Sequence, residues 1–333
     1  AFKYTALISI SIPACVEAIE ERAFFYCLML SRIEFSEGSQ LNSIGNEAFG
    51  QTSLQKVVIP RHVTHIGESV FVNLGSQLSI EFENECDIKF FDQKSFKSDS
   101  IVKLTIPKSV TELKDGWCEF TPNLTTVVIS PENENLTYVS QDKKLIAQRS
   151  DQIKNGYDTL VFSSRDVERA VIPPHIRHIS PYSFEKCMLL KSIEFSEDSE
   201  LNSIGDFAFE YATIEKVSIP KKVKCIGKFA FFNCSKLADV ELQMDSDLIS
   251  VGESAFSNTI IEKVSIPKNI KEVGTNSFNS CVRLNAVEVF GECFSVEKFC
   301  FSFCSRLSVF SMPNAKVASL SLCAFSNGFD NLT

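Results

Sequence analysis

The chain has 333 residues, a formal net charge of −9 and 44% apolar residues, with 29 Phe against a single Trp and 6 Tyr. Its Lys and Arg are dispersed, which argues against nucleic acid as the main partner because phosphate binding needs a concentrated basic face. No run of about 18 apolar residues occurs, so nothing in the sequence is expected to insert into a bilayer.

Internal repetition dominates the sequence. Residues 33–49 return at 193–209 with 13 of 17 positions identical, at an offset of 160. Both stretches are instances of a shorter unit: an Ile/Val-x-Ile-Pro or Glu-Phe-Ser stretch, then Ile-Gly, then Ala-Phe. The final Phe of this unit, the anchor Phe, recurs at short and nearly regular intervals within each half of the chain. The anchors are Phe2, Phe24, Phe49, Phe71, Phe96, Phe184, Phe209, Phe231, Phe256, Phe278, Phe301 and Phe325, and Trp117-Cys118 takes the Ala-Phe position of a degenerate copy.

Each unit has the features of one solenoid coil. Residues 54–59 alternate as a short strand with one buried face does, and Pro60, which cannot donate to a ladder, should end that strand. Gly67 indicates a tight backbone turn, and residues 68–71 are expected to form a short helical turn that places Phe71 inward. One coil cannot bury its apolar side alone, so neighbouring coils must stack.

The repeat is interrupted once. Residues 130–168 contain neither Ile-Gly nor Ala-Phe, but they carry the apolar runs 145–147 and 159–162 with Asn155-Gly156 between them. We expect a β-hairpin or two extra strands here, with a linker as the alternative. The predicted organisation is one continuous solenoid: repeat block 1 over 1–129, an inserted hairpin or irregular connection over 130–168, and repeat block 2 over 169–333.

The sequence ends at 331–333, where the next strand would begin. We therefore expect both ends to be cut through repeats, and the isolated chain to associate with itself through uncapped coils.

The units LQKVVIPRHVTHIGESVF and IEKVSIPKKVKCIGKFAFFNC closely resemble the BspA-like leucine-rich repeats, whose pattern is Leu-x-x-Ile-x-Ile-Pro, then Ile-Gly, then Ala-Phe and Cys. The resemblance covers nearly the whole chain outside 130–168. It implies an α/β repeat solenoid, a leucine-rich-repeat superhelix with a parallel sheet on the concave face and short helical turns or loops on the convex face. It further implies a protein exposed at the cell surface or secreted, associated with adhesion to host or matrix proteins.

In such a repeat the residues between the buried strand positions face solvent on the concave side. We predict a polar binding face for protein or glycan on those positions, and the alternative is a solvated surface that only prevents aggregation. The predicted binding residues are Glu34, Lys56, Val58, Glu81, Lys103, Thr105, Glu194, Lys216, Ser218, Glu241, Lys263, Ser265 and Glu288.

Cysteines recur three residues after the anchor Phe, as in Cys281 and Cys304, and are interpreted as buried thiols. A disulfide between these two is geometrically open, since they lie in successive coils. Cys293, Cys300 and Cys304 are a weak metal candidate. The pairs His62/His65 and His175/His178 are interpreted as exposed, with adventitious zinc or nickel as the alternative. Asn123, Asn135, Asn233 and Asn331 begin glycosylation sequons, which matter only in a secretory pathway.

No phosphate loop, GxGxxG, HExxH or GxSxG motif is present, so we predict a non-enzymatic protein without a cofactor. The predicted function is protein binding by a surface or secreted adhesin. The alternative is an intracellular scaffold, in the cytoplasm, that uses the same face.

Overall fold

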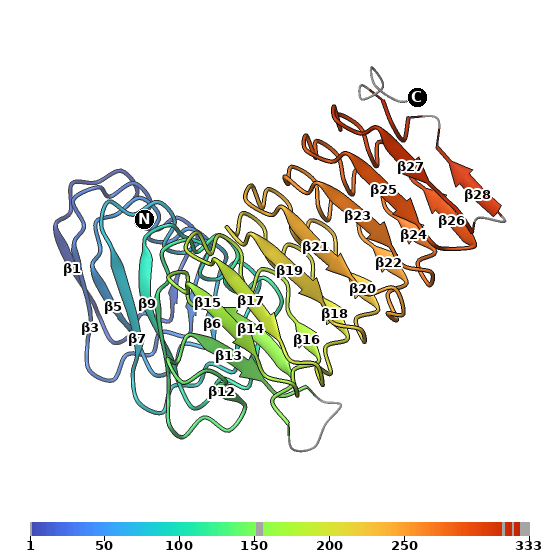
Figure 1. The fold of residues 1–333 in the computed structure, drawn as a ribbon. Coiled ribbons are helices and arrows are strands. Elements are labelled where there is room, and N and C mark those ends of the chain that lie inside the picture. Colours follow the sequence, from blue (N-terminus) through green and yellow to red (C-terminus); the bar gives the residue numbers. More distant parts are fainter. Residues whose placement is uncertain (1, 151–155, 315–316, 322, 327–333) are drawn as a thin grey trace. The chain divides into compact units, whose positions relative to one another are not determined.

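The computed structural model describes residues 2–150, 156–314, 317–321 and 323–326, and every regular element in these residues is a β-strand (Figure 1). The chain forms two compact units, an N-terminal unit over 1–149 and a C-terminal unit over 150–333. The predicted cut through a repeat at 331–333 lies outside the described residues. The block boundaries at 129/130 and 168/169 stay predictions.

The first strand of each coil stacks in parallel on its neighbours and forms what we call the first wall. The strands alternate between buried and outward residues, as the burial pattern of Lys56–Ile59 illustrates. In the N-terminal unit they are β1 (Ser9–Ile12), β3 (Arg32–Phe35), β5 (Lys56–Ile59), β7 (Leu78–Phe82), β9 (Ile101–Ile106) and β11 (Thr126–Ile129). In the C-terminal unit they are β15 (Arg169–Ile172), β17 (Ser192–Phe195), β19 (Lys216–Ile219), β21 (Asp239–Leu242), β23 (Lys263–Ile266), β25 (Ala286–Val289) and β27 (Val309–Ser311). Strand β5 ends immediately before Pro60, as predicted.

A second strand in each coil forms the second wall. In the N-terminal unit these strands are β2 (Ala18–Ile19), β4 (Ser43–Ile44), β6 (His65–Ile66), β8 (Phe90–Phe91) and β10 (Glu112–Leu113). In the C-terminal unit they are β14 (Thr159–Ser163), β16 (His178–Ile179), β18 (Ser203–Ile204), β20 (Cys225–Ile226), β22 (Ser250–Val251), β24 (Glu272–Val273), β26 (Cys293–Val296) and β28 (Val317–Leu320). Each of these C-terminal strands pairs in parallel with the next without interruption.

The anchor Phe lies in a third wall, and here the prediction of short helical turns was wrong. The amide of Phe209 donates to the carbonyl of Ala230 in the next coil at 2.7 Å, and the amide of Phe231 donates to Ala255 at 2.7 Å. Phe207 and Tyr211, two residues before and after Phe209, have φ of 56° and 60°, outside the right-handed helical region. Alternate amides of the turn therefore donate to the next coil, and those between them donate three residues back within the coil, as Ala212 does to Phe209 at 2.9 Å, in place of an α-helical ladder. The fold is a β-solenoid, and the α/β description does not hold for the described residues.

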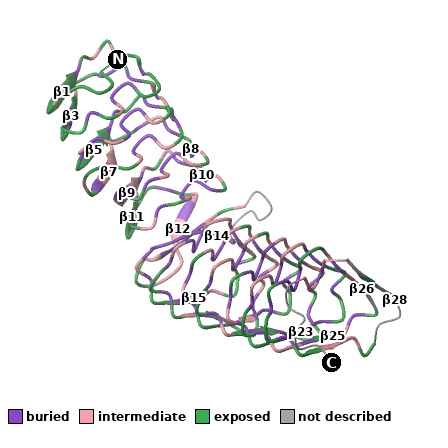
Figure 2. Ribbon diagram, turned by 90° about the horizontal axis from the view of Figure 1, so that it is seen from above, coloured by how far each residue is buried: buried purple, intermediate pink, exposed green. Residues whose placement is uncertain are grey.

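The core of each unit is a column of stacked Phe rings. In the C-terminal unit the rings from Phe184 to Phe301 stack at centroid distances of 4.7 to 5.5 Å. The anchors from Phe24 to Phe301 are buried, and the degenerate position is filled by the buried Trp117 and Cys118. Phe2 and Phe325 are the exceptions: 46% of the Phe2 surface is exposed although its ring stacks on Phe24, and Phe325 is partly exposed. Figure 2 shows buried positions alternating with exposed ones along each coil.

The glycines after Ile are required by the neighbouring coil. A Cβ on Gly227 would lie 2.5 Å from Asp206 Oδ1 and 2.6 Å from the Asp206 nitrogen, and one on Gly45 would lie 2.6 Å from the Glu21 nitrogen. The backbones of successive coils thus approach too closely at this corner for any side chain. The Asp206 carboxylate also accepts a bond from the Lys228 amide at 2.7 Å, which ties the two coils together.

Within residues 130–168, β12 (Leu136–Tyr138) and β13 (Leu145–Gln148) pair antiparallel as a hairpin of the N-terminal unit. Buried Asn133 stabilises the start of this hairpin. The side-chain amide of Asn133 donates to the carbonyls of Pro107 and Val110, and its side-chain oxygen accepts from the backbone amides of 135 and 136. The second apolar run, β14, pairs in parallel with β16 and so belongs to the second wall. The Asn155-Gly156 turn lies partly outside the described residues.

Candidate binding face and its grooves

The thirteen predicted binding residues all lie on the outward side of the first wall, and none of them is buried. Because they belong to two separate units, they form two sets. The N-terminal set is Glu34, Lys56, Val58, Glu81, Lys103 and Thr105, and the C-terminal set is Glu194, Lys216, Ser218, Glu241, Lys263, Ser265 and Glu288. That this wall is the concave one stays a prediction, and so does its role in binding.

Ladder register sets a short side chain beside each glutamate of the paired strands. Ser218 lies opposite Glu241, and Ser265 lies opposite Glu288. In the N-terminal unit Val58 lies opposite Glu81. The carboxylates of Glu241 and Glu288 are therefore exposed to solvent, whereas Glu81 is half-buried.

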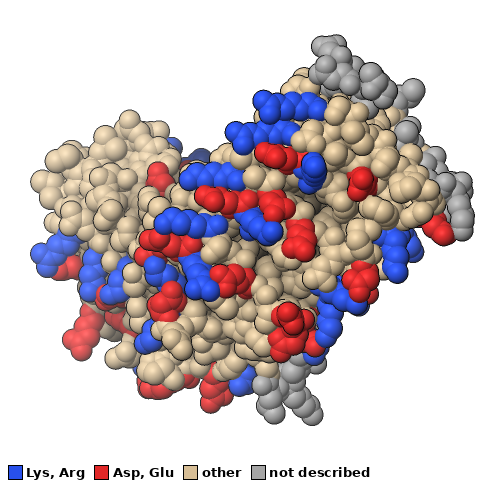
Figure 3. Space-filling model, in the orientation of Figure 1, with Lys and Arg blue, Asp and Glu red and all other residues tan. Residues whose placement is uncertain are grey.

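Most cations of this face already have an acid partner. Arg169 binds Glu194 with two bonds of 2.7 and 2.6 Å, and Lys216 contacts Asp239 at 2.8 Å. The Arg169 hydrogen bond lowers the pKa of Glu194. Basic and acidic side chains are interspersed over β15 to β23 in Figure 3. The face therefore presents pairs of opposite charges rather than a surface of one sign. This favours recognition by specific polar contacts over general attraction of an oppositely charged ligand.

The first wall opens at three of its steps, and the spacing between equivalent strand residues takes two values, a short step and a long one. Val240 follows Val217 by 23 positions, the short step, and β19 and β21 pair over four residues. Val217 follows Ile193 by 24, the long step, and β17 pairs with β19 only at Ser192 and Lys216. The step from Val240 to Val264 is also long, and β21 and β23 belong to different sheets. The second wall runs through both long steps without a break, so only the outward face opens.

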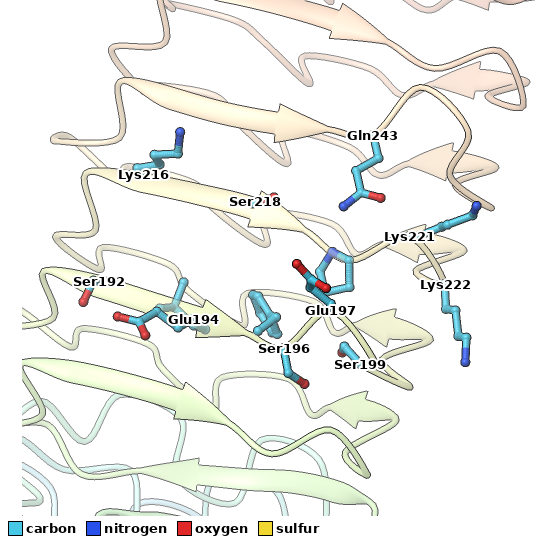
Figure 4. Close-up of a pocket in the computed structure, with 13 residues that line it drawn as sticks. Ser192, Glu194, Ser196, Glu197, Ser199, Lys216, Ser218, Lys221, Lys222 and Gln243 are labelled. Carbon is cyan, nitrogen blue, oxygen red and sulfur yellow. The ribbon is translucent and has the colours of Figure 1, made fainter.

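A groove of about 780 Å³ occupies the opening between β17 and β19 (Figure 4). Ile193 and Phe195 lie along one side, and Ser218 and Pro220 lie along the other. Glu194 and Lys216 flank the groove near the strands, while Glu197, Lys221, Lys222 and Gln243 close the end beyond them. The groove thus combines an apolar floor with charged rims of both signs.

The same groove recurs in the N-terminal unit. The opening between β3 and β5, of about 540 Å³, is lined by Ile33, Glu34, Phe35, Ser36 and Lys56. An offset of 160 maps these five onto identical residues of the β17–β19 groove. Between β3 and β5 the step is again long, and the strands belong to different sheets.

A third groove, of about 340 Å³, lies between β21 and β23. It is lined by Asp239, Val240, Glu241, Leu242, Lys263 and Ser265, which correspond to the β17–β19 groove at an offset of 47, and by Lys216. Lys216 therefore borders both grooves of the C-terminal unit. Glu81, Lys103, Thr105 and Glu288 line none of these three grooves.

The fourth long step, from Ile80 to Leu104, behaves differently. A register shift at Leu78/Ser79 absorbs the extra residue, and β7 and β9 stay paired. Lys56 and Lys103 both contact Glu81 there, at 2.8 and 3.5 Å.

Sequence reasoning missed the groove residues beyond the predicted set, above all Phe35 and its counterpart Phe195. It also missed Arg169 as the partner of Glu194. The available signal was the spacing between strands. The anchor residues show the same alternation, with intervals of 22 and 25 from Phe2 to Phe96, but not which pair of strands it separates.

The remaining candidates are structural. The recurring cysteines, including Cys281 and Cys304, are buried free thiols, and burial raises the pKa of Cys234. His62 is exposed and contacts Asp87 at 3.0 Å. Among the described residues no three His, Cys, Asp or Glu side chains gather as a metal site would require, and the side chain of Cys293 lies outside them. Nor does that part of the chain include a helix of the length and apolar character needed to cross a bilayer.

The stacked coils, with a strand ladder on one side and a ring column inside, define a leucine-rich-repeat β-solenoid. The chain belongs to the family of the BspA type leucine rich repeat region, whose model matches residues 1–125, 158–285 and 241–333. No curated protein matches the chain.

Solved structures share the fold. A leucine-rich repeat protein from Eubacterium ventriosum ATCC 27560 superposes with a TM-score of 0.73 at 22% identity, covering 96% of this chain and 82% of that one. A leucine rich cell surface protein from Faecalibacterium prausnitzii A2-165 gives 0.61 at 20%, covering 96% and 82%. The pneumococcal vaccine antigen PcpA gives 0.60 at 21%, covering 94% and 68%.

Proposed function

We propose that the chain is a non-enzymatic adhesion module, secreted or displayed at a cell surface, that binds a host or matrix protein through the outward face of the first wall. The observation that carries this proposal is the recurrence of one groove, with five identical lining residues, in both units. Two of the structures that share the fold are described as a cell surface protein and a vaccine antigen, which supports the location.

The test is binding of the purified chain to a panel of purified extracellular-matrix proteins, measured by biolayer interferometry. We expect at least one protein to bind, and the triple variant Glu194→Lys, Glu241→Lys and Glu288→Lys to weaken that binding at least about tenfold. The matched control, Glu253→Lys, Glu272→Lys and Glu297→Lys, makes the same charge change away from the outward side of the first wall and should bind like the parent chain. Equal binding by both triple variants would place the contact elsewhere, and no binding to any panel protein would overturn the adhesion role.

An intracellular scaffold is the second candidate, favoured by one observation. The cysteines whose side chains the structure describes are all free thiols, as is usual in a reducing compartment. Antibody labelling of intact and permeabilised cells decides between the two: signal only after permeabilisation would establish the scaffold and exclude surface display.

A further inference from the structure

Cysteines fill one recurring position of the coils, three residues after the anchor Phe, which we call the thiol slot. The cysteines in this slot are buried free thiols: Cys27, Cys187, Cys234, Cys281 and Cys304. Four of them donate to the carbonyl of the anchor Phe in the preceding coil, as Cys234 does to Phe209 at 3.0 Å. The slot therefore holds a small side chain that connects two coils by a weak hydrogen bond.

One pair of these five cysteines occupies successive coils. Cys281 and Cys304 are 23 residues apart, the same interval that separates their anchors, Phe278 and Phe301. Cys234, by contrast, has Ala212 and Thr259 in the thiol slots before and after it, so neither neighbouring coil offers it a thiol there.

Hydrogen bonds keep the two coils in register on both sides of the Cys281–Cys304 pair. Before the pair, the amide of Ser280 donates to the carbonyl of Ser302 at 2.8 Å. After it, β25 and β27 pair with Ala286 opposite Val309, again an interval of 23. Equivalent residues of hydrogen-bonded neighbours lie about 4.8 Å apart, and the Cα atoms of a disulfide lie about 4.4–6.8 Å apart. The backbone therefore brings the two cysteines to the separation that a disulfide requires.

The sulfur atoms lie at the same contact between coils. Cys304 Sγ is 3.2 Å from the carbonyl oxygen of Phe278, so this side chain reaches back into the coil that carries Cys281. A hydrogen bond with Cys281, together with burial, raises the pKa of Cys304. The two thiols therefore contact each other inside the core.

Oxidation of the pair leaves neither carbonyl without a donor. The Phe256 carbonyl, which accepts from Cys281 at 3.3 Å, also accepts from the Thr259 hydroxyl at 2.9 Å. The Phe278 carbonyl, which accepts from Cys304, also accepts from the Cys281 amide at 3.4 Å. The loss of two weak thiol donors therefore creates no unsatisfied buried group.

We propose that Cys281 and Cys304 form a disulfide that links two successive coils when the chain folds under oxidising conditions. Both thiols are buried in the folded chain, so the bond forms during folding. One thiolate attacks a small disulfide such as oxidised glutathione and releases one glutathione. The second thiolate attacks the resulting mixed disulfide, which joins the two protein sulfurs and releases the other glutathione. The two protein thiols lose two electrons and two protons, which the two molecules of reduced glutathione carry.

This bond goes beyond the adhesion role and does not depend on it. It closes a loop of 24 residues, from 281 to 304, and stabilises the coils of β25 and β27 by restricting the unfolded chain. The bond is expected on a secreted or surface-displayed chain and not on an intracellular scaffold, since cytosolic glutathione keeps thiols reduced.

The direct test is oxidative refolding of the purified chain. The chain is denatured and reduced, diluted into a mixture of reduced and oxidised glutathione, and treated with N-ethylmaleimide before digestion without reductant. Mass spectrometry should show one linked pair of peptides, which contains Cys281 and Cys304, while Cys234 carries the blocking group. The absence of a linked pair, or a pair that joins Cys300 to either residue, would overturn the proposal.

Urea denaturation gives the second measurement. The urea midpoint of the refolded chain should be at least about 0.5 M higher without dithiothreitol than with it. Cys304→Ser should remove this difference, and Cys234→Ser, the matched control in a thiol slot without a neighbouring thiol, should retain it. Equal midpoints for the parent chain with and without reductant would show that no stabilising link forms, and the peptide map of the parent chain decides the question if a Ser variant fails to fold.

Discussion

At the scale of single residues, the stability of each unit depends on ring stacking. Phe231 is fully buried, with its ring centroid 4.9 Å from that of Phe209 and 5.1 Å from that of Phe256. Removing such a ring leaves a cavity that two rigid coils cannot close.

We therefore expect Phe231→Ala to lower the free energy of unfolding by about 3–5 kcal/mol, as measured by urea denaturation. Tyr211→Ala is the control, because 40% of that side chain is exposed and its loss should change stability by less than about 1 kcal/mol. A small effect of Phe231→Ala would show that the column contributes little.

The pKa values of two glutamates, Glu194 and Glu200, each depend on one basic partner. The hydrogen bond from Arg169 lowers the pKa of Glu194, and the hydrogen bond from Lys222 lowers the pKa of Glu200. A carboxyl with a lowered folded-state pKa contributes stability above its unfolded value, of about 4.3, and loses it as pH falls through the folded-state pKa.

In Arg169→Gln the pKa of Glu194 should move up toward its ordinary value, as followed by NMR titration of the glutamate side chains. Lys222→Gln should instead raise the pKa of Glu200 and leave Glu194 unchanged. If Glu194 titrates identically with and without Arg169, the pair does not form in solution.

At the scale of elements, the first-wall strands and their ends were predictable, and the anchor turns were not. The second-wall strands were missed, because a pair such as His65–Ile66 before Gly67 was interpreted as part of a turn. Alternation in 54–59 and the proline at 60 are local signals, and β5 follows them. Residues 68–71 have ordinary helical propensity, but the amide of Ser69 donates to Lys94 in the next coil and that of Glu68 donates to the Asn46 side chain in the preceding one. No local pattern displays these competing bonds. The long steps in strand spacing mark where a groove can form. Whether the two strands separate at a long step depends on how the two coils pack. At Leu78/Ser79 a bulge closes one such step, which the spacing alone does not foretell.

The Ile-Gly corner gives a prediction at this scale. Gly227→Ala would place a Cβ within 2.6 Å of the Asp206 backbone, so we expect it to lower the free energy of unfolding by about 1–3 kcal/mol. Gly75→Ala is the matched substitution, since its nearest contact is the Ser53 hydroxyl at 3.1 Å, which can rotate away. Chemical denaturation of both variants measures the difference, and equal stability would contradict the close approach.

At the scale of the whole molecule, the described residues contain strands and turns only. The far-UV circular dichroism spectrum of the chain should therefore show a strand-type minimum without the double minimum of α-helix. A helical signal of appreciable size would restore the α/β description that the sequence suggested and would contradict the bonds between anchor turns.

The alternation of short and long steps also has a consequence for how such a molecule can grow. Adding or removing one doublet, a short step together with a long one, keeps the spacing of the other strands and changes the number of long steps by one. At a long step the outer sheet either opens, as between β17 and β19, or takes up the extra residue, as between β7 and β9. Two short steps in succession, from Val264 to Val287 to Phe310, instead leave β23, β25 and β27 in one uninterrupted sheet. A protein that lengthens by doublets therefore extends its outer sheet without changing the contacts between neighbouring coils.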